Sequence, residues 1–119
     1  MDEIKRLNAS KVIVIGGTGA VSLGMSEFLE VGETVVIPDI AWGSYVIMAK
    51  DKQLKFARYE MFDGDHFNLN SVKEQVNALI GKQNRIVLVV NDPCHNPTGF
   101  CMKDSDYDAL VDLLNEYDY

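Results

Sequence analysis

The segment NDPCHNPTGF, residues Asn91–Phe100, contains residue types that could do several kinds of chemistry. Cys94 and His95 are neighbours, and a thiol beside an imidazole can act as a nucleophile or bind a metal. Adjacent residues of an extended chain point to opposite sides, however, which argues against a catalytic pair. Cys94, His95 and Cys101 also lack a second cluster that would complete four metal ligands. We therefore expect no catalytic residue and no metal ligand here, and His95 is expected to be a packed histidine or to support another residue.

Asn96 is the residue of this segment whose chemistry suits a ligand. Pro97 follows it, which biases Asn96 away from the helical conformation and allows a cis peptide bond. A rigid turn of this kind can hold an amide NH₂ group at a fixed point, where it can donate to a ligand oxygen. An ordinary Asn-Pro turn completed by Gly99 explains these residues equally well.

A second chemical feature is the segment GGTGAVS, residues Gly16–Ser22. It reads as a glycine-rich turn between a strand and a helix, where backbone N–H groups and the hydroxyls of Thr18 and Ser22 could bind a phosphate. No Gly-Lys-Ser/Thr follows, and Gly17-x-Gly19 lacks a Gly or Ala three residues later, so neither nucleotide-binding fingerprint is complete. A tight turn that simply needs glycine is the alternative.

Trp42 is the single tryptophan of the chain. A large aromatic residue usually packs partly into the core. Trp42 comes soon after a predicted strand that ends at Pro38, and there it could instead offer a flat face to an aromatic ring. The sequence leaves both interpretations open.

Short apolar runs alternate with amphipathic stretches along the chain. The predicted strands are Lys11–Gly16, Glu33–Pro38, Leu54–Tyr59 and Arg85–Asn91, and the predicted helices are Ala20–Glu30, Trp42–Lys50, Ser71–Ile80 and Lys103–Tyr117. Ser71 and Glu74 stand at the spacing of a capping box, and Asp104 or Ser105 would cap the last helix. Nearly continuous apolar strands between helices predict an α/β fold with a parallel sheet. The three chemical features follow the first, second and fourth strands, and such strand ends form binding sites in parallel sheets.

Composition narrows the class of protein. The chain has 119 residues and a net charge of −7, and its lysines and arginines are scattered, which argues against a nucleic-acid partner. No apolar run approaches the roughly 20 residues that span a membrane, and the charged N-terminus does not resemble a signal peptide. We expect a cytoplasmic protein with no membrane partner, whose two cysteines are reduced thiols.

Together, GGTGA, the tryptophan after the second strand and CHNPTG resemble the aspartate aminotransferase family, the fold-type I enzymes that use pyridoxal 5′-phosphate. The resemblance runs from about Lys11 to Tyr117. It implies a three-layer parallel sheet with helices on both faces. Residues 1–119 would then be the N-terminal part of the cofactor-binding large domain, truncated before its second half and without the small domain.

The resemblance also implies roles for four residues. Gly17 and Thr18 would bind the cofactor phosphate. Trp42 would stack on the pyridine ring, and its indole N–H would meet the substrate carboxylate. Asn96, with a cis bond to Pro97, would donate to the 3′-oxygen of the cofactor and also contact the substrate. One departure concerns Trp42, because relatives often have a proline close before it and here Pro38 lies four residues earlier.

The lysine that binds the cofactor covalently lies beyond the Asn-Pro-Thr-Gly motif in this family. None of the lysines here qualifies, so the resemblance implies an inactive piece of an aminotransferase, whose parent is a homodimer that acts on an amino acid and a 2-oxo acid. A lyase or decarboxylase of the same fold is one alternative. A non-catalytic phosphate- or nucleotide-binding module is another, and an acidic interaction domain without a ligand is a third.

We expect the isolated chain to self-associate. In the family's sheet order, Val12–Ile15 would lose a neighbouring strand and leave an apolar edge open to pairing. Sedimentation over a range of concentrations should show mass above that of a monomer. A clean monomer at high concentration would contradict this expectation.

Overall fold

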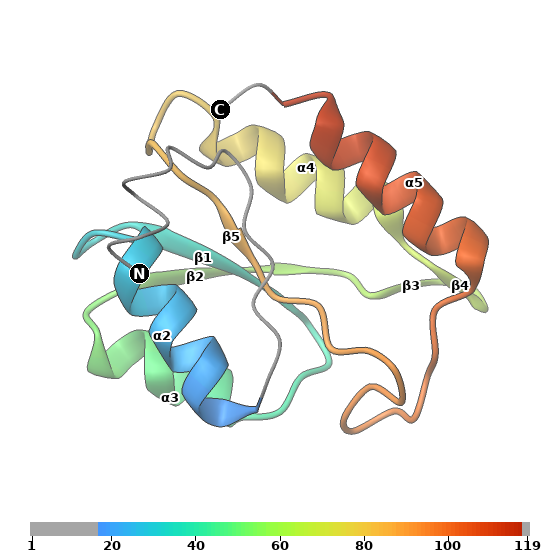
Figure 1. The fold of residues 1–119 in the computed structure, drawn as a ribbon, viewed down its shortest axis with the longest axis horizontal. Helices are drawn as coiled ribbons and strands as arrows, with labels where there is room; N and C mark the ends of the chain where they lie inside the picture. The colour runs from blue at the N-terminus through green and yellow to red at the C-terminus, as the bar shows by residue number, and fades with distance from the viewer. Residues whose placement is uncertain (1–16, 118–119) are drawn as a thin grey trace.

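The computed structural model describes residues 17–117, which form three layers (Figure 1). The middle layer is a parallel sheet in the order β2-β1-β5, made of β1 (Thr34–Pro38), β2 (Lys55–Tyr59) and β5 (Val87–Leu88). Helices α2 (Thr18–Phe28) and α3 (Ser44–Asp51) cover one face, and α4 (Leu69–Leu79) and α5 (Asp104–Asn115) cover the other. The predicted α/β architecture, a parallel sheet with helices on both faces, is confirmed. The first predicted strand, Lys11–Gly16, and the proposed apolar edge lie outside the described residues.

Strand β1 is the centre of the molecule because both faces of it are buried. Val35 and Ile37 point into a core shared with α2 and α3, whereas Val36 points into a core shared with α4 and α5. All three side chains are fully buried. Burial of each such side chain stabilises the fold by roughly 1.5–3 kcal/mol, so this β-branched strand anchors both helical layers.

The observed helices match the predicted ones to within a few residues at their ends, but two predicted caps are wrong. Asn68, not Ser71, caps α4, and its side chain accepts from Ser71 N at 3.1 Å. The Ser71 hydroxyl accepts from Glu60 N at 2.8 Å, so it joins α4 to the end of β2. Helix α5 starts after Lys103, whose N–H donates to the Asp106 carboxylate at 2.9 Å.

A short antiparallel hairpin, β3 (Phe62–Asp63) and β4 (His66–Phe67), was not predicted. Its two-residue turn is Gly64-Asp65, and Gly64 has a φ of +60°, as the first position of a tight hairpin turn requires. The strands are too short for an alternating pattern to show in the sequence. The hairpin packs Phe67 against Tyr59 in an edge-to-face contact and so extends the core beside α4.

Strand β5 pairs with β1 over only two residues, Val35↔Val87 and Val36↔Leu88. The predicted strand was longer, Arg85–Asn91. Gln83 reinforces this short contact, since its side chain accepts from Thr34 N at 3.0 Å and donates to Thr34 O at 2.9 Å. The same amide donates to Arg85 O at 2.8 Å. The buried Gln83 side chain thus bonds to the backbone at the start of β1 in the place that a longer β5 would occupy.

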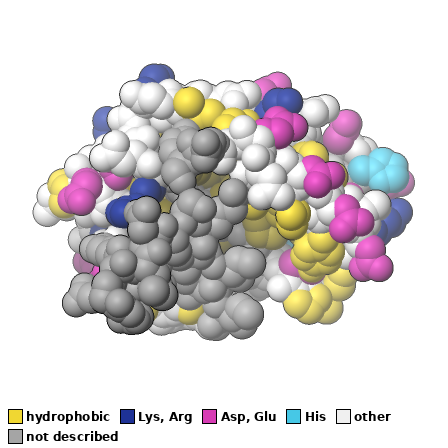
Figure 2. Space-filling view, turned by 45° about the horizontal axis from the view of Figure 1, so that its top comes forward, with side chains coloured by type: hydrophobic (Ala, Val, Ile, Leu, Met, Phe, Trp, Pro, Cys, Tyr) yellow, Lys and Arg dark blue, Asp and Glu magenta, His cyan; other side chains and the backbone are white. Residues whose placement is uncertain are grey.

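Acidic side chains are scattered over the face in Figure 2, and the few basic ones on this face do not gather into a patch. Within residues 17–117, no helix is long and apolar enough to cross a bilayer.

Gln83→Ala should destabilise the chain by about 2–3 kcal/mol, because three hydrogen bonds are lost and partly buried backbone groups of Thr34 are left without this partner. The measurement is urea unfolding followed by circular dichroism. Gln75→Ala on the half-buried side of α4 is the matched control and should change stability by less than about 0.5 kcal/mol. Equal effects of the two substitutions would show that Gln83 does not hold β5 against β1.

Candidate functional site

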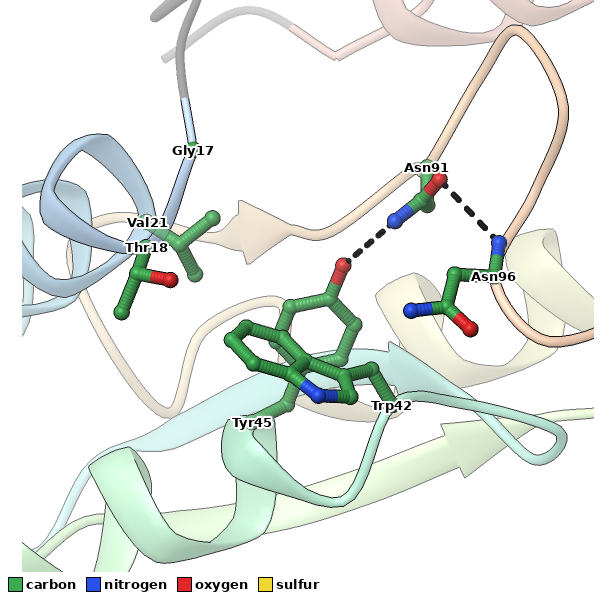
Figure 3. A pocket seen from close by; sticks show the side chains of 7 residues that line it. All are labelled: Gly17, Thr18, Val21, Trp42, Tyr45, Asn91 and Asn96. Atoms are coloured by element: carbon green, nitrogen blue, oxygen red, sulfur yellow. Dashed lines mark hydrogen bonds between the residues drawn. The ribbon is translucent and has the colours of Figure 1, made fainter.

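A pocket of about 240 Å³ lies where α2 begins and where β1 and β5 end (Figure 3). It is lined by Gly17, Thr18, Val21, Trp42, Tyr45, Asn91 and Asn96. The four residues predicted from the sequence, Gly17, Thr18, Trp42 and Asn96, are therefore brought together in one place. Ser22, the further hydroxyl considered for the phosphate, is not among the lining residues.

The start of α2 presents open backbone to this pocket. Gly17 is the N-cap residue and, lacking a side chain, cannot cap the first turn, which also has no acidic residue. The N–H groups of Ala20 and Val21 both donate to Gly17 O. Among residues 17–117, nothing lies within 4 Å of a Cβ placed at Gly17, so packing against these residues does not explain the glycine. The uncapped positive end of the helix is suited to an anion.

Trp42 lies at the pocket, not in the core. Its side chain is 37% exposed, and its ring packs edge-to-face on Tyr45 with centroids 5.9 Å apart. Asp39 fixes the loop that carries Trp42, because its carboxylate accepts from Ile40 N at 2.8 Å and from Met61 N at 3.0 Å. The stacking of Trp42 on an aromatic ring stays a prediction.

Asn91 and Tyr45 were not singled out in the sequence, and they connect the two sides of the pocket. Asn91 Nδ2 donates to the Tyr45 hydroxyl at 2.9 Å, and Asn91 Oδ1 accepts from Asn96 N at 3.4 Å, as the dashed lines in Figure 3 show. The available signals were a polar residue at the end of an apolar strand and a tyrosine one helical turn after Trp42.

Asn96 sits in a compact turn. Its bond to Pro97 is cis, as the resemblance implied, and the bond between Asp92 and Pro93 is also cis. His95 N donates to Phe100 O at 2.8 Å, and Gly99, with a φ of +74°, donates to His95 O at 2.6 Å. These bonds close the turn and hold Asn96 beside Asn91.

The polar side chains of the pocket fall into two groups. Asn91 and Tyr45 are bonded to each other, whereas the hydroxyl of Thr18, the indole N–H of Trp42 and the amide of Asn96 make no hydrogen bond with the described residues. A bound molecule could therefore use these three groups without breaking bonds seen within residues 17–117.

His95 lies under the turn and is only 2% exposed. Its Nδ1 is 2.8 Å from the Thr98 hydroxyl, and its Nε2 has no hydrogen-bond partner among the described residues. Burial lowers the pKa of His95, and the nearby Ile40 carbonyl and the carboxylates of Asp39 and Asp92 oppose this shift only in part. The prediction of a packed histidine is confirmed.

Cys94 does not pair with His95. Its sulfur lies 3.5 Å from the sulfur of Cys101, and both are free thiols, as expected. Within the described part of the chain, no group of three or more His, Cys, Asp and Glu residues could hold a metal ion.

The sequence model of aminotransferase class I and II matches residues 2–119, so the chain belongs to this family. It is 32% identical to an aspartate aminotransferase of Pyrococcus abyssi over 93% of this chain and 28% of that protein. An aspartate aminotransferase of Pseudomonas aeruginosa is 30% identical over 95% of this chain and 29% of that protein.

Solved structures agree with the family assignment. An aminotransferase from Anaerococcus prevotii superposes with a TM-score of 0.79 at 28% identity, over 87% of this chain and 25% of that one. An aromatic aminotransferase from Pyrococcus horikoshii gives a TM-score of 0.69 at 30% identity, over 87% of this chain and 26% of that one. The chain thus spans between a quarter and a third of the length of these relatives.

The buried imidazole of His95 should make stability depend on pH. Because its pKa is lowered in the folded state, the unfolded chain binds the proton more readily, and stability should fall as the pH drops below about 6.5. Urea unfolding between pH 6.5 and 5 should give an unfolding free energy that rises with pH, with a slope below the one-proton limit of about 1.4 kcal/mol per pH unit.

His95→Asn keeps a polar atom near the position of Nδ1 and should remove most of this slope. His66→Asn, at the exposed histidine of the hairpin, is the matched control and should keep it. An unchanged slope in His95→Asn would contradict the assignment of the pH dependence to His95.

Proposed function

We propose that this chain supplies part of the pyridoxal 5′-phosphate site of an aminotransferase that moves an amino group between an amino acid and a 2-oxo acid. The observation that carries the proposal is the pocket in which Gly17, Thr18, Trp42 and Asn96 meet. Family membership supports the aminotransferase class.

The residues present fit this cofactor on chemical grounds. The uncapped N-terminus of α2 and the Thr18 hydroxyl suit a phosphate dianion. The half-exposed ring of Trp42 offers an apolar face to a pyridine ring. The Asn96 amide, without a bond to the described residues, can donate to an oxygen on that ring.

Each residue would contribute a distinct physical effect. The positive end of α2 binds and orients the anionic group, and Trp42 excludes water from one face of the ring. Donation from Asn96 favours the anionic form of the ring oxygen, since a hydrogen bond to the charged form lowers its pKa. Asn91 holds the Asn96 backbone in place through the bond at 3.4 Å. The cofactor, when bound, supplies the electron sink for chemistry at the amino-acid α-carbon.

In the parent enzyme the pocket would also receive the substrate carboxylate, near the Trp42 indole and Asn96. We expect the parent to be a homodimer, and we expect the chain of 119 residues alone to catalyse no transamination. A lyase or decarboxylase of the same fold would use the same cofactor contacts, because a fold does not fix the reaction. A nucleotide-binding module would instead need the phosphate contacts without the ring and oxygen contacts.

The test follows Trp42 fluorescence, since Trp42 is the only tryptophan. Pyridoxal 5′-phosphate and pyridoxamine 5′-phosphate should both quench it saturably, and ADP and inorganic phosphate should bind much more weakly. Pyridoxamine 5′-phosphate has no aldehyde and cannot react with surface lysines, so its quenching reports only non-covalent binding. Thr18→Ala and Asn96→Ala should each weaken binding by about tenfold or more, the loss of one charge-assisted hydrogen bond.

Matched controls are Ser26→Ala on the exposed side of α2 and Asn70→Ala on α4, which should leave the affinity unchanged. Equal binding of ADP would favour the nucleotide module, and the absence of quenching by every ligand would favour an interaction domain. Borohydride treatment with pyridoxal 5′-phosphate should modify lysines without selecting one. Stoichiometric labelling of a single lysine, or measurable transamination, would overturn the expectation of inactivity.

A further inference from the structure

Two thiols flank the turn that carries Asn96, and the proposed function uses neither of them. Cys94 Sγ and Cys101 Sγ are 3.5 Å apart, and Cys94 N donates to Cys101 Sγ at 3.1 Å. Both residues are exposed, so they do not fill a core. The two are the only cysteines of the chain, although seven positions separate them in sequence.

The backbone of the turn brings these thiols together. His95 N donates to Phe100 O at 2.8 Å, which makes His95 and Phe100 the closing pair of the turn. Cys94 and Cys101 are the next residues outward on either side. Cys94 has a φ of +54°, a left-handed conformation that is uncommon outside glycine and is kept only where surrounding contacts hold it.

Other uses of paired thiols find no support in this structure. Within residues 17–117 no third ligand completes a metal site with them. His95 bonds to Thr98 and not to Cys94, so the Cys94–His95 pair is not arranged as a thiol with its own general base. Two exposed sulfurs in van der Waals contact are placed to react with each other.

We propose that Cys94 and Cys101 are a redox pair that forms a reversible disulfide across the base of the Asn96 turn. The oxidant is a low-molecular-weight disulfide such as glutathione disulfide. One protein thiol loses its proton and attacks this disulfide, which forms a mixed disulfide and releases one glutathione. The second protein thiol loses its proton and attacks the protein sulfur of the mixed disulfide, which releases the second glutathione. Two protein thiols are oxidised, and one glutathione disulfide is reduced to two thiols.

The disulfide would close residues 94–101 into a covalent ring that contains Asn96. In the reduced state, hydrogen bonds and packing alone hold this turn. The contact with the Cys101 sulfur raises the pKa of the Cys94 thiol, which lowers its thiolate fraction at neutral pH. Oxidation should therefore become faster as the pH rises. Because the disulfide ties the two ends of the turn together, the oxidised turn should also open less often than the reduced turn.

The first experiment equilibrates the 119-residue chain with glutathione buffers of increasing disulfide content, quenches with acid and alkylates the remaining thiols. Intact-mass spectrometry should show both thiols disappearing together, with little glutathione attached. Cys94→Ser and Cys101→Ser should each accumulate one attached glutathione instead. Independent attachment of glutathione to both cysteines of the unsubstituted chain would overturn the proposal.

The second experiment repeats the equilibration in concentrated urea, where only chain connectivity brings the thiols together. The equilibrium constant for forming the disulfide should be about tenfold or more lower than in the folded chain, because the fold holds the reacting sulfurs in contact. Equal constants in the two conditions would show that the fold does not position them.

Hydrogen exchange then tests the effect on the turn. The amides of Asn96 and of residues 98 to 100 should exchange more slowly in the oxidised chain, and those of α4 should not change. Unchanged exchange in the turn would refute the clamp. None of these measurements uses a cofactor, so failure of the proposed cofactor site and failure of the redox pair are distinguishable.

Discussion

The parallel contact between β1 and β5 is the interaction on which the pocket depends. It contains only two paired residues on each strand, yet it places the loop with Asn96 beside the loop with Trp42. Buried bonds around it supply what the short ladder lacks. Val89 N donates to Val36 O at 2.8 Å, and the Tyr59 hydroxyl donates to Val89 O at 3.0 Å.

These supporting bonds share one physical property, which is that each satisfies a buried or partly buried backbone group beside the β1–β5 contact. An unpaired buried carbonyl or N–H group costs about 1–3 kcal/mol, more than a typical bond contributes when made. The Gln83 side chain bonds to backbone groups just before β5, and the Tyr59 hydroxyl bonds to a backbone carbonyl just after it. Burial raises the pKa of Tyr59, so its hydroxyl remains a donor across the physiological range. The register of β5, and with it the position of Asn91, is therefore fixed by side chains from elsewhere in the chain.

This dependence explains which parts of the structure the sequence could predict. The strands and helices that bury continuous apolar surface, such as β1 and α4, follow from local periodicity. The convergence of Gly17, Trp42 and Asn96 follows from the rule that parallel strands end at one edge of the sheet. Neither argument reaches Asn91 and Tyr45, because their bond joins residues 46 positions apart and depends on side-chain placement.

The cap of α4 was predicted wrongly for the same reason, because a tertiary contact decides it. Ser71 stands at the right spacing from Glu74, but its hydroxyl is taken by Glu60 N, a tertiary partner that a local motif cannot reveal. Asn68 then provides the cap one turn earlier. The β3–β4 hairpin was not predicted for a different reason, because two-residue strands show no periodic pattern and only Gly64-Asp65 marks the turn.

The division of polar groups in the pocket is the strongest physical argument about what it does. A folded chain that needed Asn96 only as a turn former would be expected to use its amide in the turn, as Asn-containing turns usually do. Here the backbone closes the turn through His95 and Gly99, and the amide of Asn96 makes no bond with the described residues. Asn91, which lies at the same edge, has both ends of its amide engaged. The two asparagine side chains of this loop therefore differ. The Asn91 amide is hydrogen-bonded at both ends, whereas the Asn96 amide makes no hydrogen bond with the described residues. Under the proposed function, this arrangement would lower the cost of binding, because folding fixes the Asn96 backbone before any ligand arrives and leaves its amide free of bonds to the described residues.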